Sequence, residues 1–165
     1  TNDVLIMKID EEHVLNISIE NSGKKSRSHF NLRLLDINDE MFDAPNLPMI
    51  SMTTFQTVDF QRLCRDISHI GSEIIIERSF KKIGFRCIGD FAEQYTEYDI
   101  DSDSVNFKSM KDSFSLKYLN LFTKATSMCS NMKLIHHGEG MPLVLEYKVT
   151  SLGDLMFYLA PKSDE

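Results

Sequence analysis

One pattern of secondary-structure elements occurs twice between residue 50 and the end of the chain, and it restricts the fold more than any other feature. Alternating and helical spacings of apolar residues mark the elements of each copy. The first copy has a strand, a helix and three strands at 50–56, 57–70, 73–78, 82–89 and 94–100. The second has the same series at 103–109, 113–126, 131–137, 142–149 and 154–160. A β-α-β-β-β unit present twice predicts an α+β domain built from two related halves.

The residues before this repeat form two further regions. Strands are predicted at 3–9, 14–20 and 29–37. The stretch 36–50 contains Asp36, Asp39, Glu40, Asp43, Pro45 and Pro48, which excludes a regular element and predicts an exposed linker. We therefore expect boundaries at 1–35, 36–50 and 51–165. Thr1 is followed at once by a predicted strand, which suggests either a chain cut inside a fold or a processed chain.

Met41 and Phe42 are apolar residues in the middle of this acidic linker. A linker that only connects two domains is usually polar along its whole length. The two side chains therefore either pack against the linker's own domain or bind a partner. The linker sequence alone leaves both alternatives open.

The composition is that of a folded domain. Of 165 residues 42% are hydrophobic and 26% are charged, which is enough to form a core, and no apolar run is long enough to span a bilayer. Cys64, Cys87 and Cys129 lack metal-binding spacing and are expected to be thiols in a reducing compartment. The net charge of −7 argues against nucleic-acid binding unless the basic residues gather on one surface.

The first predicted helix has basic residues opposite its apolar face. The apolar face comprises Phe60, Leu63, Cys64, Ile67 and Ile70. The opposite face carries Arg62, Arg65 and His69. Asp59 and Asp66 dilute this basic charge, so an ordinary solvated surface is the alternative interpretation.

The second predicted helix has the same arrangement with less acidic dilution. Its expected apolar face comprises Phe114, Tyr118, Leu121, Phe122 and Ala125. Lys117, Asn120 and Lys124 lie opposite, and no acidic residue occurs between Asp112 and Glu139. An acidic chain with two basic helix faces is expected to separate its charge by surface.

The patterns that resemble catalytic or metal sites are incomplete. The stretch 99–110 begins like a calcium loop, but Ser104 and Met110 replace the glycine and glutamate that this geometry requires. His136 and His137 are neighbours in a predicted strand, so they point to opposite faces and cannot bind one metal together. No phosphate-binding loop and no nucleophile–base pair is found. We therefore expect neither enzymatic activity nor a cofactor.

Three stretches in this order resemble proliferating cell nuclear antigen, the family of eukaryotic and viral DNA sliding clamps. They are DFQRLCRDISHIG (59–71), LKYLNLFTKAT (116–126) and MPLVLEYKVTSLGDLMFYLAPK (141–162). The resemblance implies the DNA-clamp fold, in which repeated β-α-β-β-β units place two helices on one face of antiparallel sheets. It also implies that 1–35 belongs to a first clamp domain, 36–50 to the interdomain linker and 51–165 to the second clamp domain.

The resemblance implies a role in DNA replication and repair in the nucleus. The full-length clamp would be a homotrimeric ring around duplex DNA and would act as a processivity factor for DNA polymerase. Arg62, Arg65, Lys117 and Lys124 would contact phosphates without reading the sequence. Expected partners besides DNA are the clamp loader, DNA polymerase and repair proteins that carry short clamp-binding motifs, with no membrane involved.

The resemblance also implies a hydrophobic pocket for partner peptides. Its residues would be Met41, Phe42 and Ala44 in the linker, Pro142, and Tyr158, Ala160 and Pro161 near the end of the chain. Short motifs would insert aromatic side chains there. Pro161 would end the strand ladder and leave the tail free to meet a peptide.

This chain departs from the family pattern at several positions. Phe42-Asp43-Ala44-Pro45 stands where Leu-Gly-Ile-Pro is common, which predicts a reshaped pocket. Phe80 replaces the usual regulatory lysine, and most of the first domain is missing, so the chain alone is expected to lack a complete set of ring surfaces. Two rivals follow, a ring-free clamp half that serves only as a peptide-interaction module and an unrelated β-rich hydrolase.

Overall fold

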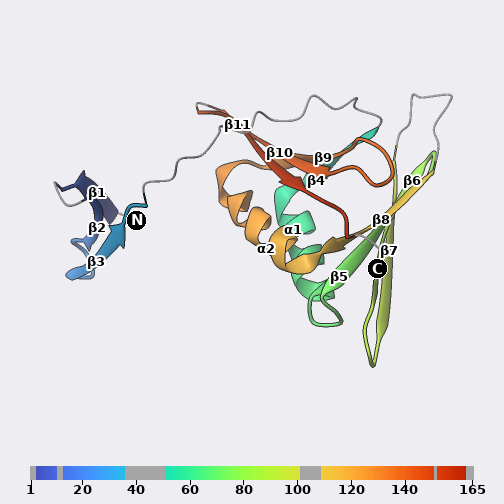
Figure 1. Cartoon of the computed structure of the whole chain (residues 1–165), viewed down its shortest axis with the longest axis horizontal. Coiled ribbons are helices and arrows are strands. Elements are labelled where there is room, and N and C mark those ends of the chain that lie inside the picture. Colours follow the sequence, from blue (N-terminus) through green and yellow to red (C-terminus); the bar gives the residue numbers. More distant parts are fainter. Residues whose placement is uncertain (1–2, 11–12, 36–50, 101–108, 151, 163–165) are drawn as a thin grey trace. The chain divides into compact units, whose positions relative to one another are not determined.

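The computed structural model describes residues 3–10, 13–35, 51–100, 109–150 and 152–162. They belong to two compact units, Thr1–Pro45 (unit 1) and Asn46–Glu165 (unit 2), which we describe separately. Figure 1 labels the elements of both units along the chain. No helix in the described part of the chain is long and apolar enough to cross a membrane.

Unit 1 contains a three-stranded antiparallel sheet in the order β1-β2-β3. Its strands are β1 (Asp3–Ile9), β2 (Val14–Asn21) and β3 (Ser26–Arg33). The predicted third strand, 29–37, begins too late, because the turn after β2 is tight. There the backbone N–H of Lys24 donates to Asn21 Oδ1 at 2.7 Å, and pairing resumes at once between Asn21 and Ser26.

Apolar side chains of unit 1 are exposed on both faces of this sheet. Successive residues of a strand point to opposite faces, so Leu5, Met7 and Ile9 share one face while Val4 and Ile6 share the other. All five are exposed. None of the described residues of unit 1 is buried, so its three strands lack the buried face that stabilises a small sheet.

Unit 2 contains two four-stranded antiparallel sheets. The C-terminal sheet has the order β11-β10-β9-β4, and the central sheet has the order β7-β6-β5-β8. The strands of the C-terminal sheet are β4 (Ser51–Gln56), β9 (Asn131–His136), β10 (Leu143–Val149) and β11 (Gly153–Leu159). Those of the central sheet are β5 (Glu73–Arg78), β6 (Lys82–Ile88), β7 (Glu93–Asp99) and β8 (Met110–Ser115).

The two halves of unit 2 exchange their first strands. β4 precedes the first helix in sequence but pairs with β9 of the second half. β8 precedes the second helix but pairs with β5 of the first half. Each sheet therefore needs both copies of the repeat, so the two halves form one domain.

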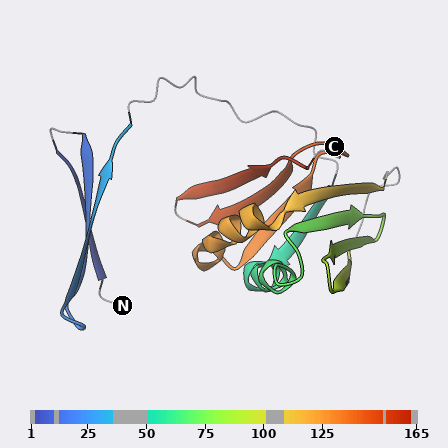
Figure 2. The ribbon, with the colours of Figure 1, turned by 60° about the horizontal axis from the view of Figure 1, so that its bottom comes forward.

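The helices of unit 2 lie side by side on one side of the sheets (Figures 1 and 2). They are α1 (Thr57–Ile67) and α2 (Leu116–Phe122), and a 3₁₀ segment, η1 (Thr123–Met128), continues α2. α1 packs against both α2 and η1. Its buried side chains include Phe60, Leu63, Cys64 and Ile67, as the predicted apolar face requires.

The second helix begins later than its apolar spacing predicts. Periodicity favours a helix from residue 113, whereas residues 110–115 form β8, with Met110 and Phe114 buried. The inward side chains of α2 are Leu116 and Leu119, while Tyr118 and Leu121, predicted to be buried, are exposed. The cause is tertiary, because pairing with β5 satisfies the backbone of residues 110–115 as a strand. The strand predicted at 103–109 lies outside the described residues except for Ser109.

Aromatic residues form part of the mainly aliphatic core of unit 2. Phe55, Phe60, Phe85 and Tyr98 form one cluster, with ring centroids 5.3–6.1 Å apart. The Phe122 ring stacks on Phe157 at 4.5 Å, which ties the end of α2 to β11. Apolar burial and ring contacts of this kind are the main source of stability in such a domain.

Candidate functional site

The exposed face of α1 carries the two predicted arginines. Arg62 and Arg65 are exposed and lie three residues apart, hence on one side of the helix. Arg65 Nε lies 3.6 Å from Asp66 Oδ1, and both side chains are more than half exposed. An ion pair this exposed is weak, so it leaves the guanidinium available to another anion.

Lys117 and Lys124 are exposed on the neighbouring α2 and η1. The side-chain amide of Gln61 donates to the Thr123 carbonyl at 3.0 Å and joins α1 to the start of η1. Arg62 and Lys124, their sequence neighbours, therefore lie on adjoining helices. We name the four residues Arg62, Arg65, Lys117 and Lys124 the basic helix face.

Tyr118 belongs to the surface of α2, contrary to the prediction that it faces the core. Its ring lies 5.8 Å from the Lys117 ammonium, within the range of a cation–π contact. The later helix start explains this exposure, because apolar positions counted from Leu116 place Leu119 inward and Tyr118 outward. A helix predicted to begin at Leu116 would have placed Tyr118 on the exposed face from the sequence alone.

Thr57 fixes the beginning of α1 against the end of η1. Its hydroxyl donates to the Cys129 carbonyl at 2.8 Å, and its backbone N–H donates to the Ser130 carbonyl at 2.9 Å. Thr57 is almost completely buried. It holds the two basic helices in register at one end, a role that the sequence pattern does not indicate.

The outer face of the C-terminal sheet carries an apolar row across all four strands. Met52, Ile135, Val144 and Tyr158 stand opposite one another in the strand register. The flanking residues Leu134, Leu145 and Phe157 point to the core, so the row faces away from the helices. Met52 and Tyr158 at its ends are exposed, while Ile135 and Val144 in its middle are buried.

The predicted pocket residues fall partly on this row. Tyr158 is its end residue, and Pro142 is half-buried immediately before β10. Ala160 is exposed and Pro161 half-buried just after β11. The remaining predicted residues, Met41, Phe42 and Ala44, lie outside the described residues.

Lys162, the residue directly after Pro161, is bonded to the central sheet, which corrects the expectation that the tail is free at this point. The backbone N–H of Lys162 donates to the Ser113 carbonyl of β8 at 2.8 Å. The Lys162 ammonium forms an ion pair with Glu73 of β5, and the Ser113 hydroxyl donates to the same carboxylate at 3.2 Å. The hydrogen bond from Lys162 holds the pKa of Glu73 below its usual value, although burial opposes this shift.

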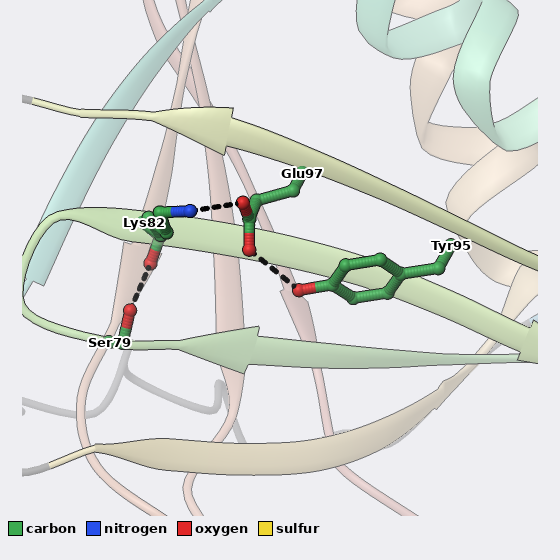
Figure 3. A network of polar contacts seen from close by, with 4 residues as sticks. All are labelled: Ser79, Lys82, Tyr95 and Glu97. Carbon is green, nitrogen blue, oxygen red and sulfur yellow. Dashed lines mark hydrogen bonds and ion pairs between the residues drawn. The ribbon is translucent and has the colours of Figure 1, made fainter.

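A polar network covers the outer face of β6 and β7 (Figure 3). Lys82 forms an ion pair with Glu97, the Tyr95 hydroxyl donates to Glu97 at 3.0 Å, and the Ser79 hydroxyl donates to the Lys82 carbonyl at 3.3 Å. The bond from Lys82 lowers the pKa of Glu97, and the bond to Glu97 raises the pKa of Tyr95. Both shifts favour the protonation states already present near neutral pH. The network therefore stabilises the hairpin and holds no group poised to transfer a proton.

His136 is the one buried histidine in the described part of the chain, at the end of β9. Burial lowers its pKa to about 4, helped by the charges of Arg78 and His137. Arg78, also buried, donates from Nε to the hydroxyl of Ser51, which pairs with His136. Among the described residues no group of three or more metal-binding side chains is present.

The β-α-β-β-β halves, their exchanged strands and the helices on one side of the sheets define a clamp-type α+β domain. The sequence model of the proliferating cell nuclear antigen C-terminal domain matches residues 37–162. The chain belongs to the proliferating cell nuclear antigen family. Both the resemblance and the fold class predicted from the sequence are thereby confirmed.

A viral relative agrees with this assignment. The chain is 32% identical over 160 residues to the probable DNA polymerase sliding clamp 1 of Paramecium bursaria Chlorella virus 1. The match covers 92% of this chain and 61% of the viral protein. The chain therefore spans less than two thirds of the length of this relative.

Proposed function

We propose that this chain is part of a DNA sliding clamp that acts as a processivity factor for DNA polymerase. The observation that carries the proposal is the basic helix face on a chain of net charge −7, within a family of clamps. Arginine and lysine side chains on two adjoining helices can bind backbone phosphates, and such contacts do not read the base sequence. The clamp would encircle duplex DNA, act without catalysis, and serve replication and repair in the nucleus.

The domain boundaries belong to the same proposal. Residues 1–35 would be part of a first clamp domain, whose remaining elements would cover the apolar faces of the β1-β2-β3 sheet. Residues 36–50 would be the interdomain linker. Residues 51–165 would be the second clamp domain, which contains both sheets of unit 2.

A ring is supported by the two sheet edges. β3 is an edge strand of unit 1 with Arg27 and Arg33 and no acidic residue. β7 is an edge strand of unit 2 with Glu93, Glu97 and Asp99 and no basic residue. In a homotrimer β3 of one copy would pair with β7 of the next, joining unpaired backbone groups of opposite local charge.

The DNA contact is tested by removing charge from the second helix. Lys117→Ala with Lys124→Ala should weaken binding of the assembled ring to duplex DNA and reduce the salt slope by about one unit per lost phosphate contact. Binding is measured by fluorescence anisotropy from low to high salt on two unrelated DNA sequences. Lys148→Ala with Lys133→Ala, on the C-terminal sheet, is the matched control. An unchanged slope in the first variant contradicts the proposal.

The outer apolar row supports a second part of the function, the recruitment of partners that carry short motifs. A peptide with one aliphatic and two aromatic residues on a helical turn would dock beside Tyr158, Ala160 and Pro161. Clamp loader, polymerase and repair proteins would compete for this pocket. The linker residues Met41, Phe42 and Ala44 remain part of the proposed peptide contact on the strength of the family resemblance alone.

Tyr158→Ala should reduce peptide affinity at least about tenfold, because truncation of a central aromatic anchor commonly costs about 2 kcal/mol. Isothermal titration with a synthetic peptide of this kind measures the effect. Asp154→Ala, on the same strand and exposed, is the control and should bind as the wild type does. Wild-type affinity in Tyr158→Ala contradicts the pocket. Peptide binding by a protein that neither assembles nor binds DNA would instead favour the ring-free interaction module.

A further inference from the structure

The segment after β11 is held at two points three residues apart. Leu159, the last residue of β11, is buried in the core. The N–H of Lys162 is bonded to the Ser113 carbonyl of β8, in the other sheet. Ala160 and Pro161 therefore bridge the C-terminal and central sheets, as the end of the ribbon beside β8 illustrates (Figure 1).

Three side chains and one backbone hydrogen bond form the second attachment, at Lys162. The Glu73 carboxylate accepts from the Lys162 ammonium with one oxygen and from the Ser113 hydroxyl with the other. On the paired strands β5 and β8, Ser113 stands opposite Ile75 and Glu73 opposite Ser115, so Glu73 and Ser113 are diagonal neighbours on one face. We name Glu73, Ser113 and Lys162 the tail latch.

We propose that the tail latch is a positioning device that holds Ala160 and Pro161 in the shape that receives a partner peptide. The proposal rests on the peptide pocket proposed above and adds three residues that would not themselves touch the peptide. Ordering a backbone residue has a cost in conformational entropy. A wall already fixed by the latch removes this cost from the binding step, which is the general advantage of preorganisation.

The Lys162–Glu73 ion pair differs from the other ion pairs of the central sheet in its location. The Lys111–Glu77 pair, at 3.1 Å, joins the same two strands but involves no residue of the tail. The Lys162–Glu73 pair is about half exposed at both partners and adds little to global stability. Its consequence is therefore local, at the pocket wall.

The test compares peptide binding by this chain and by variants of the two ion pairs. Glu73→Gln and Lys162→Met should each weaken binding of the synthetic peptide about two- to fivefold, the range expected for one exposed ion pair. Glu77→Gln should leave affinity unchanged. The charge swap Glu73→Lys with Lys162→Glu should recover most of the loss, which loss of an unrelated structural contact would not allow.

A second measurement follows the latch directly. Hydrogen exchange of the Lys162 amide, which is bonded to Ser113, should accelerate in Glu73→Gln and return toward the wild-type rate in the charge swap. Unchanged exchange and unchanged affinity in Glu73→Gln would overturn the latch while leaving the pocket intact. Failure of the wild type itself to bind the peptide would overturn the pocket and, with it, the role assigned to the latch.

Discussion

At the scale of single residues, buried polar side chains make the domain sensitive to pH. His136 is 8% exposed at the edge of the core and lies near the buried Arg78 guanidinium. A proton on this imidazole would add a second positive charge where water cannot screen it. The folded protein therefore keeps His136 neutral over a range in which an unfolded histidine becomes charged.

Acidification should destabilise unit 2 through His136. The folded pKa of about 4 lies below the ordinary value of 6.5, so the unfolded chain binds this proton first. The contribution of His136 is fully present above pH 6.5 and is lost as pH falls from 6.5 toward 4. The loss amounts to at most about 3 kcal/mol, since each pKa unit corresponds to about 1.4 kcal/mol.

Urea unfolding at a series of pH values between 7 and 5 measures this effect. In His136→Gln the free energy of unfolding should depend less on pH over this range than in the wild type. An identical pH dependence in the two proteins would show that another group carries the acid sensitivity.

At the scale of elements, the segment after α1 approaches the β6–β7 turn so closely that only glycine fits at residue 89 without displacement of the backbone. A Cβ atom placed on Gly89, at the start of the β6–β7 turn, would lie 1.9 Å from the Ile70 carbonyl oxygen. Ile70 follows α1 and is held by a hydrogen bond from its N–H to the Ile67 carbonyl at 2.9 Å. The contact is between backbones, so no side chain can rotate to relieve it.

Gly89→Ala should lower the free energy of unfolding by about 1–3 kcal/mol, the usual range for overpacking at a site that cannot adjust. Chemical denaturation followed by circular dichroism measures the change. Asp90→Ala, an exposed residue of the same turn, is the matched control and should change stability by less than about 0.5 kcal/mol. Equal stability of the two variants would mean that the backbones can separate at little cost.

Local patterns predicted the elements but not their long-range partners. The spacing of Phe60, Leu63 and Ile67 identified α1 and its exposed arginines, because helical periodicity depends only on nearby residues. The start of α2 was missed because residues 110–115 become a strand through pairing with β5, far away in sequence. The tail latch was missed for the same reason, since Lys162 and Glu73 are separated by 89 positions.

At the scale of the whole molecule, basic and acidic residues are concentrated on different elements. The helix side of unit 2 exposes the basic helix face, the β7 edge is acidic, and the β3 edge is basic. A net charge of −7 is therefore compatible with a basic surface for phosphates. Opposite charge on two different edges also favours contact between copies of the chain.

Self-association should depend on the charge of these edges. Arg27→Glu with Arg33→Glu makes both edges acidic and should weaken association at least about tenfold, because like charges placed across an interface are strongly unfavourable. Adding Glu93→Lys and Asp99→Lys to the same chain reverses both edges and should restore association. Sedimentation velocity over a range of concentrations measures both effects. If association is as strong in the Arg27→Glu, Arg33→Glu variant as in the wild type, the β3–β7 contact is excluded.

Edges of opposite sign would also give the proposed ring a direction. A two-fold axis through a single edge would bring β3 against β3 or β7 against β7 and would oppose like charges, so a dimer joined through one such edge is disfavoured. In the proposed ring, contacts would then run head to tail, with β3 of each copy facing β7 of the next. Such a series has two outcomes, closure after a fixed number of copies or growth into an open filament. The edge charges would determine only that successive copies have the same orientation. The rotation angle between successive copies would determine how many copies close a ring.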